Sequence, residues 1–150
     1  AATLTFVTSK ESTTEQPNYF VRNSKKKTST QLTFFQHPYP SLKDVTKEIV
    51  RYKRSDGVQL TGTLYLPVGY KKGDKALPTL MWAYPQEFVN ASHAGQIKGS
   101  PYRFIRPSRL GAVLWVARGY AVFDNISMPI VARDGKEAND TFIEQLIDNA

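Results

Sequence analysis

LPTLMWA, at residues 77–83, is the stretch that decides the fold of this 150-residue chain. It is a nearly continuous apolar run, which is typical of a strand covered on both faces. A shorter run of this kind occupies residues 120–123, and a helical pattern lies between the two. Strands that alternate with helices favour a mostly parallel sheet with helices on its faces. We therefore predict an α/β fold, with a site beyond the carboxyl ends of the strands.

Two helices are predicted on either side of the second run by the spacing of apolar residues. Ser108 can cap the first helix, and Gly119 can end it. The second helix begins at Asn139 or Asp140. The apolar faces expected are Leu110, Val113, Leu114 and Ala117 in the first helix, and Phe142, Ile143, Leu146 and Ile147 in the second.

A hairpin is predicted upstream of the first apolar run. Residues 45–54 and 58–66 alternate in character, and Ser55-Asp56-Gly57 supplies a tight turn between them. In front of the hairpin, the sequence HPYP at residues 37–40 breaks the strand pattern, because each proline removes an amide donor and favours extended geometry in its predecessor. We expect a domain boundary between residues 37 and 38.

The first 36 residues are predicted to form three short strands, at residues 3–8, 19–22 and 29–35. Each is rich in β-branched or aromatic residues. Three strands have too little apolar surface to fold alone, so we expect them to complete a sheet with members that lie elsewhere.

The net charge of +7 raises the question of a polyanionic partner. Only Lys25, Lys26 and Lys27 form a run of cations, however, and they lie where a hairpin turn is expected. A solvated turn is the better interpretation, and we expect no nucleic-acid partner. The longest apolar runs fall short of the roughly 20 residues that a membrane helix needs, so no membrane partner is expected either.

The absence of cysteine excludes a disulfide framework, a thiolate zinc site and a cysteine nucleophile. The two histidines, His37 and His93, lie in predicted loops without the spacing of metal ligands. We expect neither a metal nor a cofactor. The cellular compartment stays open, and export to a bacterial periplasm is one option.

Several motifs resemble the opening of the catalytic domain in the prolyl oligopeptidase family. They are GVQLTGTLYLP at residues 57–67, LPTLMWAYP at 77–85 and ARGYAV at 117–122. Three further patterns are similar to the glutamyl endopeptidase branch of that family: YPQEF at residues 84–88, KGSP at 98–101 and GKEAND at 135–140. Each motif is weak alone, while their order and spacing together are specific.

This resemblance implies a domain organisation and a chemistry. Residues 38–150 would be the N-terminal portion of an α/β-hydrolase catalytic domain, and residues 1–37 the last strands of a β-propeller. The family hydrolyses peptide bonds with a nucleophilic serine, and the glutamyl branch is associated with cleavage after acidic residues. The implied partners are a peptide substrate and the remainder of the chain's own catalytic domain and propeller.

Tyr84 matches the tyrosine that ends the corresponding strand in the family and donates its hydroxyl to the oxyanion of the tetrahedral intermediate. Such a donor must be fixed and must point at the oxygen that gains charge. Without the resemblance, Tyr84 would be interpreted as an aromatic residue at a strand end. Gln86 departs from the glycine that the branch usually carries, and a side chain there could narrow the oxyanion loop.

The serine-aspartate-histidine triad is not expected within these residues. Hydrolases of this fold carry the nucleophile in a Gly-x-Ser-x-Gly elbow, and the sequence contains none. We therefore expect the chain to be inactive alone. The alternatives are a non-catalytic binding or structural module on the same scaffold, and an esterase of the same fold.

A preference for acidic side chains requires cations, and arginine can grip a carboxylate with two hydrogen bonds. The candidates are Arg103, Arg106, Arg109 and Arg133, with solvated loop positions as the alternative. Asp124 ends the second predicted strand, where it can line the site or hydrogen-bond to nearby backbone.

Overall fold

The computed structural model describes residues 3–96, 99–133 and 135–150, so Lys98 of the KGSP motif lies outside the described residues. The chain forms two compact units, which are described separately. The first contains Ala1–Asp44 with Tyr102–Arg106, and the second contains Val45–Pro101 with Pro107–Ala150. The two units meet in sequence between residues 44 and 45.

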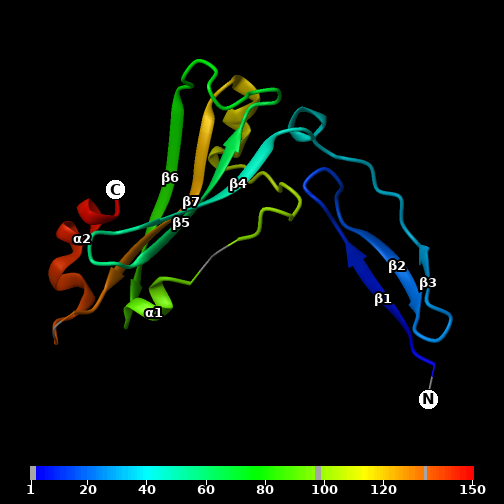
Figure 1. The fold of residues 1–150 in the computed structure, drawn as a ribbon, viewed down its shortest axis with the longest axis horizontal. Coiled ribbons are helices and arrows are strands. Elements are labelled where there is room, and N and C mark those ends of the chain that lie inside the picture. Colours follow the sequence, from blue (N-terminus) through cyan, green and yellow to red (C-terminus); the bar gives the residue numbers. More distant parts are fainter. Residues whose placement is uncertain (1–2, 97–98, 134) are drawn as a thin grey trace. The chain divides into compact units, whose positions relative to one another are not determined.

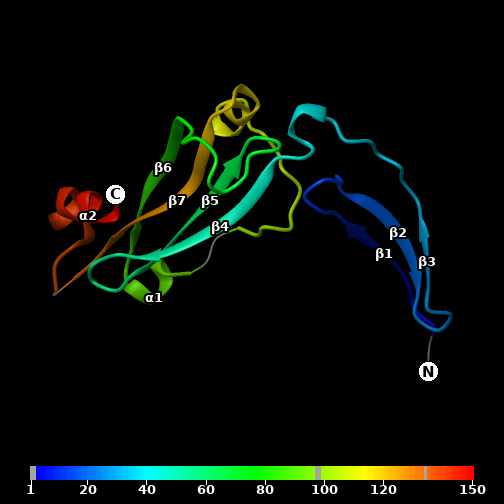
Figure 2. The same cartoon turned by 45° about the horizontal axis from the view of Figure 1, so that its top comes forward.

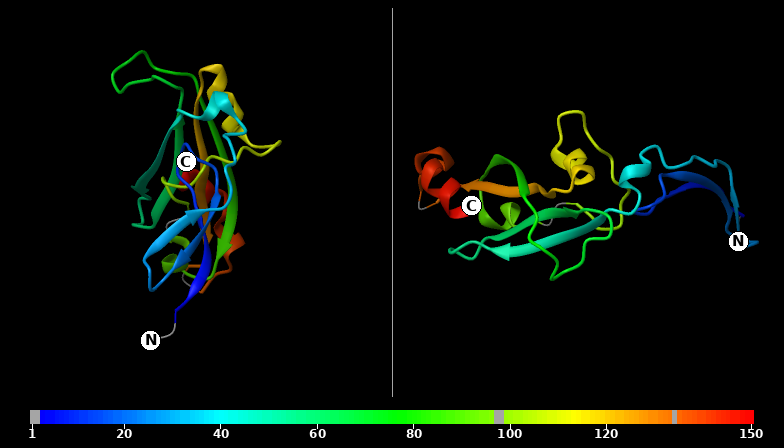
Figure 3. Two further views of the ribbon diagram at one scale, coloured as in Figure 1. Left: turned by 90° about the vertical axis from the view of Figure 1, so that its right-hand side faces the viewer. Right: turned by 90° about the horizontal axis from the view of Figure 1, so that it is seen from above.

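The first unit is built on a three-stranded antiparallel sheet in the order β1-β2-β3 (Figures 1 and 3). Its strands are β1 (Thr5–Lys10), β2 (Asn18–Asn23) and β3 (Thr28–Gln31). The lysine run lies in the turn between β2 and β3, as predicted. The 3-10 helix η1 (Pro40–Leu42) follows the sheet.

The third strand is shorter than the predicted span of residues 29–35, since it ends at Gln31. Beyond Gln31, the side chain of Asn18 accepts hydrogen bonds from the segment that follows the strand. Its Oδ1 accepts hydrogen bonds from the hydroxyl of Thr33 at 2.9 Å and from the backbone N–H of Phe35 at 2.8 Å. These bonds to a side chain of β2 replace the backbone ladder that would continue the strand.

The second unit carries a four-stranded sheet in the order β4-β5-β7-β6 (Figure 2). Its strands are β4 (Thr46–Lys53), β5 (Gln59–Leu66), β6 (Thr79–Phe88) and β7 (Ala121–Val131). The predicted hairpin is confirmed, because β4 and β5 pair antiparallel along their whole length. The 3-10 helix η2 (Ala112–Arg118) comes between β6 and β7.

The prediction of a mostly parallel sheet was wrong for the described residues. β5 pairs antiparallel with both β4 and β7, and only β6 and β7 are parallel. Parallel pairing requires a long crossover between strands. Among the described strands, only the connection from β6 to β7, which contains η2, is a crossover of this kind. A tight turn joins β4 to β5 and reverses the chain, so these two strands are antiparallel.

The strand at the first apolar run is longer and more exposed than predicted. It extends to Phe88 rather than Ala83, and it forms one edge of the sheet. Met81 and Trp82 are about half exposed, so the strand is not covered on both faces in the described part of the chain. By contrast, most of the neighbouring strand β7 is buried, from Ile126 to Val131 above all.

The first predicted helix is a 3-10 helix, and it starts after Gly111 rather than at Ser108. A 3-10 helix repeats every three residues, which brings Val113 and Val116 to the same buried face. The predicted face based on a 3.6-residue period was therefore right for Val113 and wrong for the other three residues, since Leu110, Leu114 and Ala117 are exposed. Gly119 ends the helix as predicted, in the left-handed conformation with φ of 87°.

The second predicted helix is α2 (Phe142–Asn149), preceded by the 3-10 helix η3 (Ala138–Thr141). Neither Asn139 nor Asp140 caps α2, because the reciprocal capping pair is Glu137 and Asp140 at the start of η3. The apolar face was also predicted wrongly. Ile143 and Ile147 of α2 are mostly exposed, whereas the buried residues are polar: Gln145 and Asn149.

Gln145 and Asn149 are buried because they satisfy the backbone of β7. Gln145 accepts a hydrogen bond from the N–H of Val131 at 2.9 Å and donates to its carbonyl at 2.8 Å. Asn149 donates to the carbonyl of Pro129 at 3.0 Å. Residues separated by four positions lie on one face of a helix, so α2 docks on β7 through this polar face.

Candidate functional site

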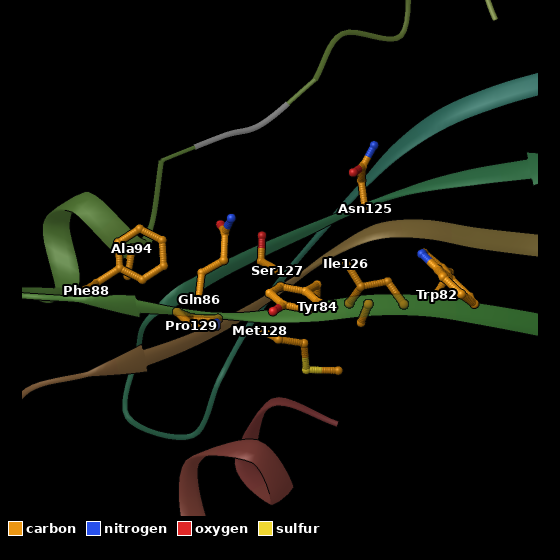
Figure 4. Close-up of a pocket in the computed structure, with 11 residues that line it drawn as sticks. Trp82, Tyr84, Gln86, Phe88, Ala94, Asn125, Ile126, Ser127, Met128 and Pro129 are labelled. Atoms are coloured by element: carbon orange, nitrogen blue, oxygen red, sulfur yellow. The ribbon is translucent and has the colours of Figure 1, made fainter. Parts of the chain in front are cut away.

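A pocket of about 200 Å³ lies on β6 and β7 of the second unit (Figure 4). Its lining also includes Ala94 of the short helix α1 (Ala91–Ala94). The side chains of Gln86, Ser127 and Asn125 project from one side of the two strands, while Met128 projects from the other side, toward α2 (Figure 4). The lining residues are Trp82, Ala83, Tyr84, Gln86, Phe88, Ala94, Asn125, Ile126, Ser127, Met128 and Pro129.

A β-bulge in β7 shapes this pocket. Met81 pairs with Phe123 and Ala83 with Ile126, so β7 contains one residue more than β6 over this interval. The extra residue is accommodated at Asn125, which adopts a left-handed conformation with φ of 51°. Asparagine tolerates this conformation better than most residues with a side chain. Bulges redirect side chains and are frequent next to active sites.

Tyr84 is the predicted catalytic residue, and it lines the pocket just past the bulge. Its partner across the parallel ladder is Ser127. The sequence predicted that Tyr84 ends its strand. This was wrong, because β6 continues through Phe88. The side chain is 80% exposed, so its phenol is accessible to a ligand rather than packed in the core.

Ser127 is buried beside Tyr84, and its hydroxyl is held by β5. The Ser127 Oγ lies 3.1 Å from the Thr61 Oγ1 and accepts a hydrogen bond of 3.3 Å from the Thr61 backbone N–H. These two contacts fix the floor of the pocket where the β5–β7 ladder has ended. Ser127 carries no signal in the sequence, because nothing in a single sequence marks the register that brings it next to Tyr84.

The four candidate arginines are not brought together within either unit. Arg103 and Arg106 belong to the first unit, whereas Arg109 and Arg133 belong to the second. Arg106 forms an ion pair of 2.6 Å with Glu11, and Arg133 forms one of 2.7 Å with Asp56. None of the four lines the pocket around Tyr84.

Asp56 joins two arginines at the β4–β5 turn. Arg54, whose side chain is fully buried, donates to both carboxylate oxygens of Asp56 at 2.9 Å. Arg54 also donates to the carbonyl of Pro129 at 3.1 Å and to Asn149 Oδ1 at 2.9 Å. The hydrogen bonds from Arg54 lower the pKa of Asp56 to about 2, with further help from the charge of Arg133.

The remaining polar residues considered in the sequence are not among those that line this pocket. His37 belongs to the first unit, and its Nδ1 accepts a hydrogen bond of 3.0 Å from the N–H of Tyr39. His93 lies in α1 and is exposed. Asp124 does not end a strand, since it lies within β7 just before Asn125.

The described residues contain neither a candidate membrane span nor a cluster of metal ligands. No helix in residues 3–96, 99–133 and 135–150 has the length and apolar character needed to cross a bilayer. Over the same residues, no three His, Asp or Glu side chains gather closely enough to hold a metal ion.

Comparison with known proteins identifies relatives of the chain. No protein-family profile matches it. It is 46% identical over 148 residues to a probable chloroplastic glutamyl endopeptidase of Oryza sativa subsp. japonica, and 45% identical over 148 residues to one of Arabidopsis thaliana. These alignments include 98% of the chain but only 16% and 15% of the relatives, so the chain corresponds to a small part of each.

Two solved peptidase structures contain a part with a fold similar to that of this chain. An acylaminoacyl peptidase of Pyrococcus horikoshii matches 97% of the chain with a TM-score of 0.51 at 17% identity. A prolyl endopeptidase matches 97% of the chain with a TM-score of 0.51 at 16% identity. The chain covers 22% and 20% of these two structures.

The fold and the relatives together define the class: a sheet-rich α/β segment that resembles parts of peptidase structures. More narrowly, the resemblance to the glutamyl endopeptidase branch of the prolyl oligopeptidase family is confirmed, because the chain matches part of two probable glutamyl endopeptidases over 98% of its own length.

Proposed function

We propose that the chain is part of a serine endopeptidase and that Tyr84 donates a hydrogen bond to the oxyanion during hydrolysis of a peptide bond. The observation that carries this proposal is the position of the Tyr84 phenol, 80% exposed in a pocket beside a β-bulge. The resemblance to glutamyl endopeptidases supports the role of this tyrosine.

The proposed chemistry assigns one step to this chain. A serine hydroxyl of the parent protein attacks the carbonyl carbon of the substrate while its proton passes to the triad histidine, and the π electrons of the carbonyl move onto the carbonyl oxygen. The neutral phenol of Tyr84 donates its O–H to this oxygen, which carries more negative charge in the transition state than in the bound substrate. The donor therefore lowers the barrier more than it strengthens ground-state binding. We assign the serine and its histidine and acid partners to the rest of the parent protein, so the chain alone would be inactive.

The proposed domain organisation follows the same division. Residues 1–37 would be the end of a β-propeller, and residues 38–150 the N-terminal portion of an α/β-hydrolase domain. The separate three-stranded sheet of the first unit and the mixed sheet of the second support this division. The partners would be a peptide substrate and the remainder of the parent protein, without nucleic acid or membrane.

Cleavage after glutamate or aspartate is the finer part of the proposal. The names of the plant relatives support it. Arg103, Arg106, Arg109 and Arg133 remain the candidates for binding the acidic side chain. Arg106 and Arg133 already pair with carboxylates of this chain, so Arg109 is the leading candidate in the second unit.

Tyr84→Phe in the full-length parent protein tests the oxyanion role. The substitution keeps the ring and removes only the hydroxyl. We expect kcat for peptide hydrolysis to fall by roughly 10² to 10³, the typical effect of losing one oxyanion donor, with little change in KM. Tyr19→Phe, on an exposed tyrosine of β2 in the first unit, is the matched control and should retain full activity.

The rival functions give different results. A fluorophosphonate probe should label the parent protein if it has an activated serine, and absence of labelling together with absence of peptide hydrolysis would favour the non-catalytic module. Labelling with hydrolysis of esters but not of peptides would favour the esterase. A Tyr84→Phe variant that hydrolyses peptides as fast as the wild type would remove Tyr84 from the mechanism.

A further inference from the structure

Asn125 combines two unusual properties for a residue within a strand. It is exposed in the middle of β7, and its backbone is held in the left-handed conformation by the bulge. Its side chain lines the same pocket as Tyr84 and projects from the same side of the sheet as Gln86 (Figure 4). Non-glycine residues in sparsely populated conformations cost free energy and concentrate at functional sites.

The amide of Asn125 is available for a ligand. Within residues 3–96, 99–133 and 135–150 its side chain makes no hydrogen bond, whereas the neighbouring Ser127 hydroxyl is already held by Thr61. A primary amide offers two N–H donors and one acceptor oxygen. It can therefore pair with both the C=O and the N–H of an extended peptide backbone.

Among the described residues, those that line the pocket include no charged side chain. The polar groups of the pocket are the phenol of Tyr84, the indole N–H of Trp82, the amides of Gln86 and Asn125, and the hydroxyl of Ser127. A carboxylate that leaves water needs a cation or several aligned donors to offset its desolvation. Neutral groups of this kind suit the neutral amides of a peptide main chain instead.

We propose that Asn125 is a substrate-binding residue whose side-chain amide hydrogen-bonds to the main chain of a peptide next to the scissile bond. The pocket then binds the peptide backbone, and any preference for an acidic side chain arises outside it. This inference rests on the proposed function, because it assumes that a peptide lies against Tyr84.

Asn125→Gly in the full-length protein tests the inference. Glycine adopts the left-handed conformation freely, so the bulge is retained while the amide is removed. Lys27→Gly is a matched control, since Lys27 also has a positive φ, of 52°, but lies in the β2–β3 turn of the first unit. Both variants are assayed on two peptides that differ only in glutamate or glutamine before the scissile bond, and both are checked by thermal unfolding.

We expect Asn125→Gly to lower kcat/KM about threefold to tenfold, because one neutral hydrogen bond is lost. The change should arise mainly from a higher KM, and the factor should be the same for both peptides. Lys27→Gly should leave both values unchanged. Unchanged kinetics in Asn125→Gly, or a loss confined to the glutamyl peptide, would overturn the inference while leaving the peptidase assignment intact. A wild-type protein that cleaves neither peptide would instead overturn the proposed function, and this inference with it.

Discussion

Asp56 allows a prediction of stability against pH that can be worked out from the structure. Its carboxylate lies between the buried Arg54 and the half-exposed Arg133, and its pKa falls from 3.8 to about 2. A difference of this size corresponds to about 2.4 kcal/mol of unfolding free energy, at 1.36 kcal/mol for a tenfold change in proton affinity. Because the Asp56 side chain is 29% exposed, solvent screening reduces the expected value to about 1–2 kcal/mol.

The sign follows from the direction of the pKa change. A carboxyl whose pKa is lower in the folded state stabilises that state when both states are ionised, above about pH 4. The stabilisation is lost as pH falls from about 4 toward 2, and about half of it is gone at pH 3. Asp56→Asn keeps an oxygen that can accept from Arg54 but removes the charge.

We therefore expect Asp56→Asn to lower the unfolding free energy by about 1–2 kcal/mol at pH 7 and by about half as much at pH 3. The assay is urea denaturation of the 150-residue chain, followed by far-UV circular dichroism at both pH values. Asp148→Asn, on an exposed carboxylate of α2, is the control and should show no such dependence. An equal loss for Asp56→Asn at the two pH values would refute the electrostatic account.

Two further predictions concern packing and selectivity. A Cβ at Gly62 of β5 would overlap the ring of Phe123, so Gly62→Ala should lower the unfolding free energy of the chain by about 1–3 kcal/mol. The Gly62→Ala/Phe123→Leu double variant should recover part of this loss, as measured by urea denaturation. The absence of any coupling between the two changes would contradict this packing. In the full-length protein, Arg109→Ala should lower the ratio of kcat/KM for a glutamyl peptide to that for a glutaminyl peptide by about tenfold, as expected for the loss of one charge-assisted contact. An unchanged ratio would remove Arg109 from acidic recognition.

The sequence predicted the features that depend on local chemistry. The alternation of residues 45–66 around Asp56–Gly57 gave the β4–β5 hairpin correctly, because turn type and strand period are both local properties. The end of η2 at Gly119 was predicted for the same reason, since its left-handed conformation favours glycine.

The features that were predicted wrongly depend on tertiary contacts. The apolar residues Ile143 and Ile147 indicated the packed face of α2, yet Gln145 and Asn149 occupy it because the backbone of β7 needs hydrogen-bond partners there. No single-sequence pattern reports that need. The bulge at Asn125 was likewise missed, because a register shift shows only when the partner strand is in place. The position of Tyr84 in a pocket came from resemblance rather than from periodicity.

The polar docking of α2 has a consequence for association between chains. On the side of β7 away from β6, the groups of Pro129 and Val131 would otherwise form an open row of backbone donors and acceptors. Proline contributes no N–H there, and the amides of Gln145 and Asn149 occupy the remaining groups. Exposed rows of this kind are templates for strand addition and aggregation. The side chains of α2 thus cover these groups of β7, so that a foreign strand cannot pair with Pro129 and Val131 on this side.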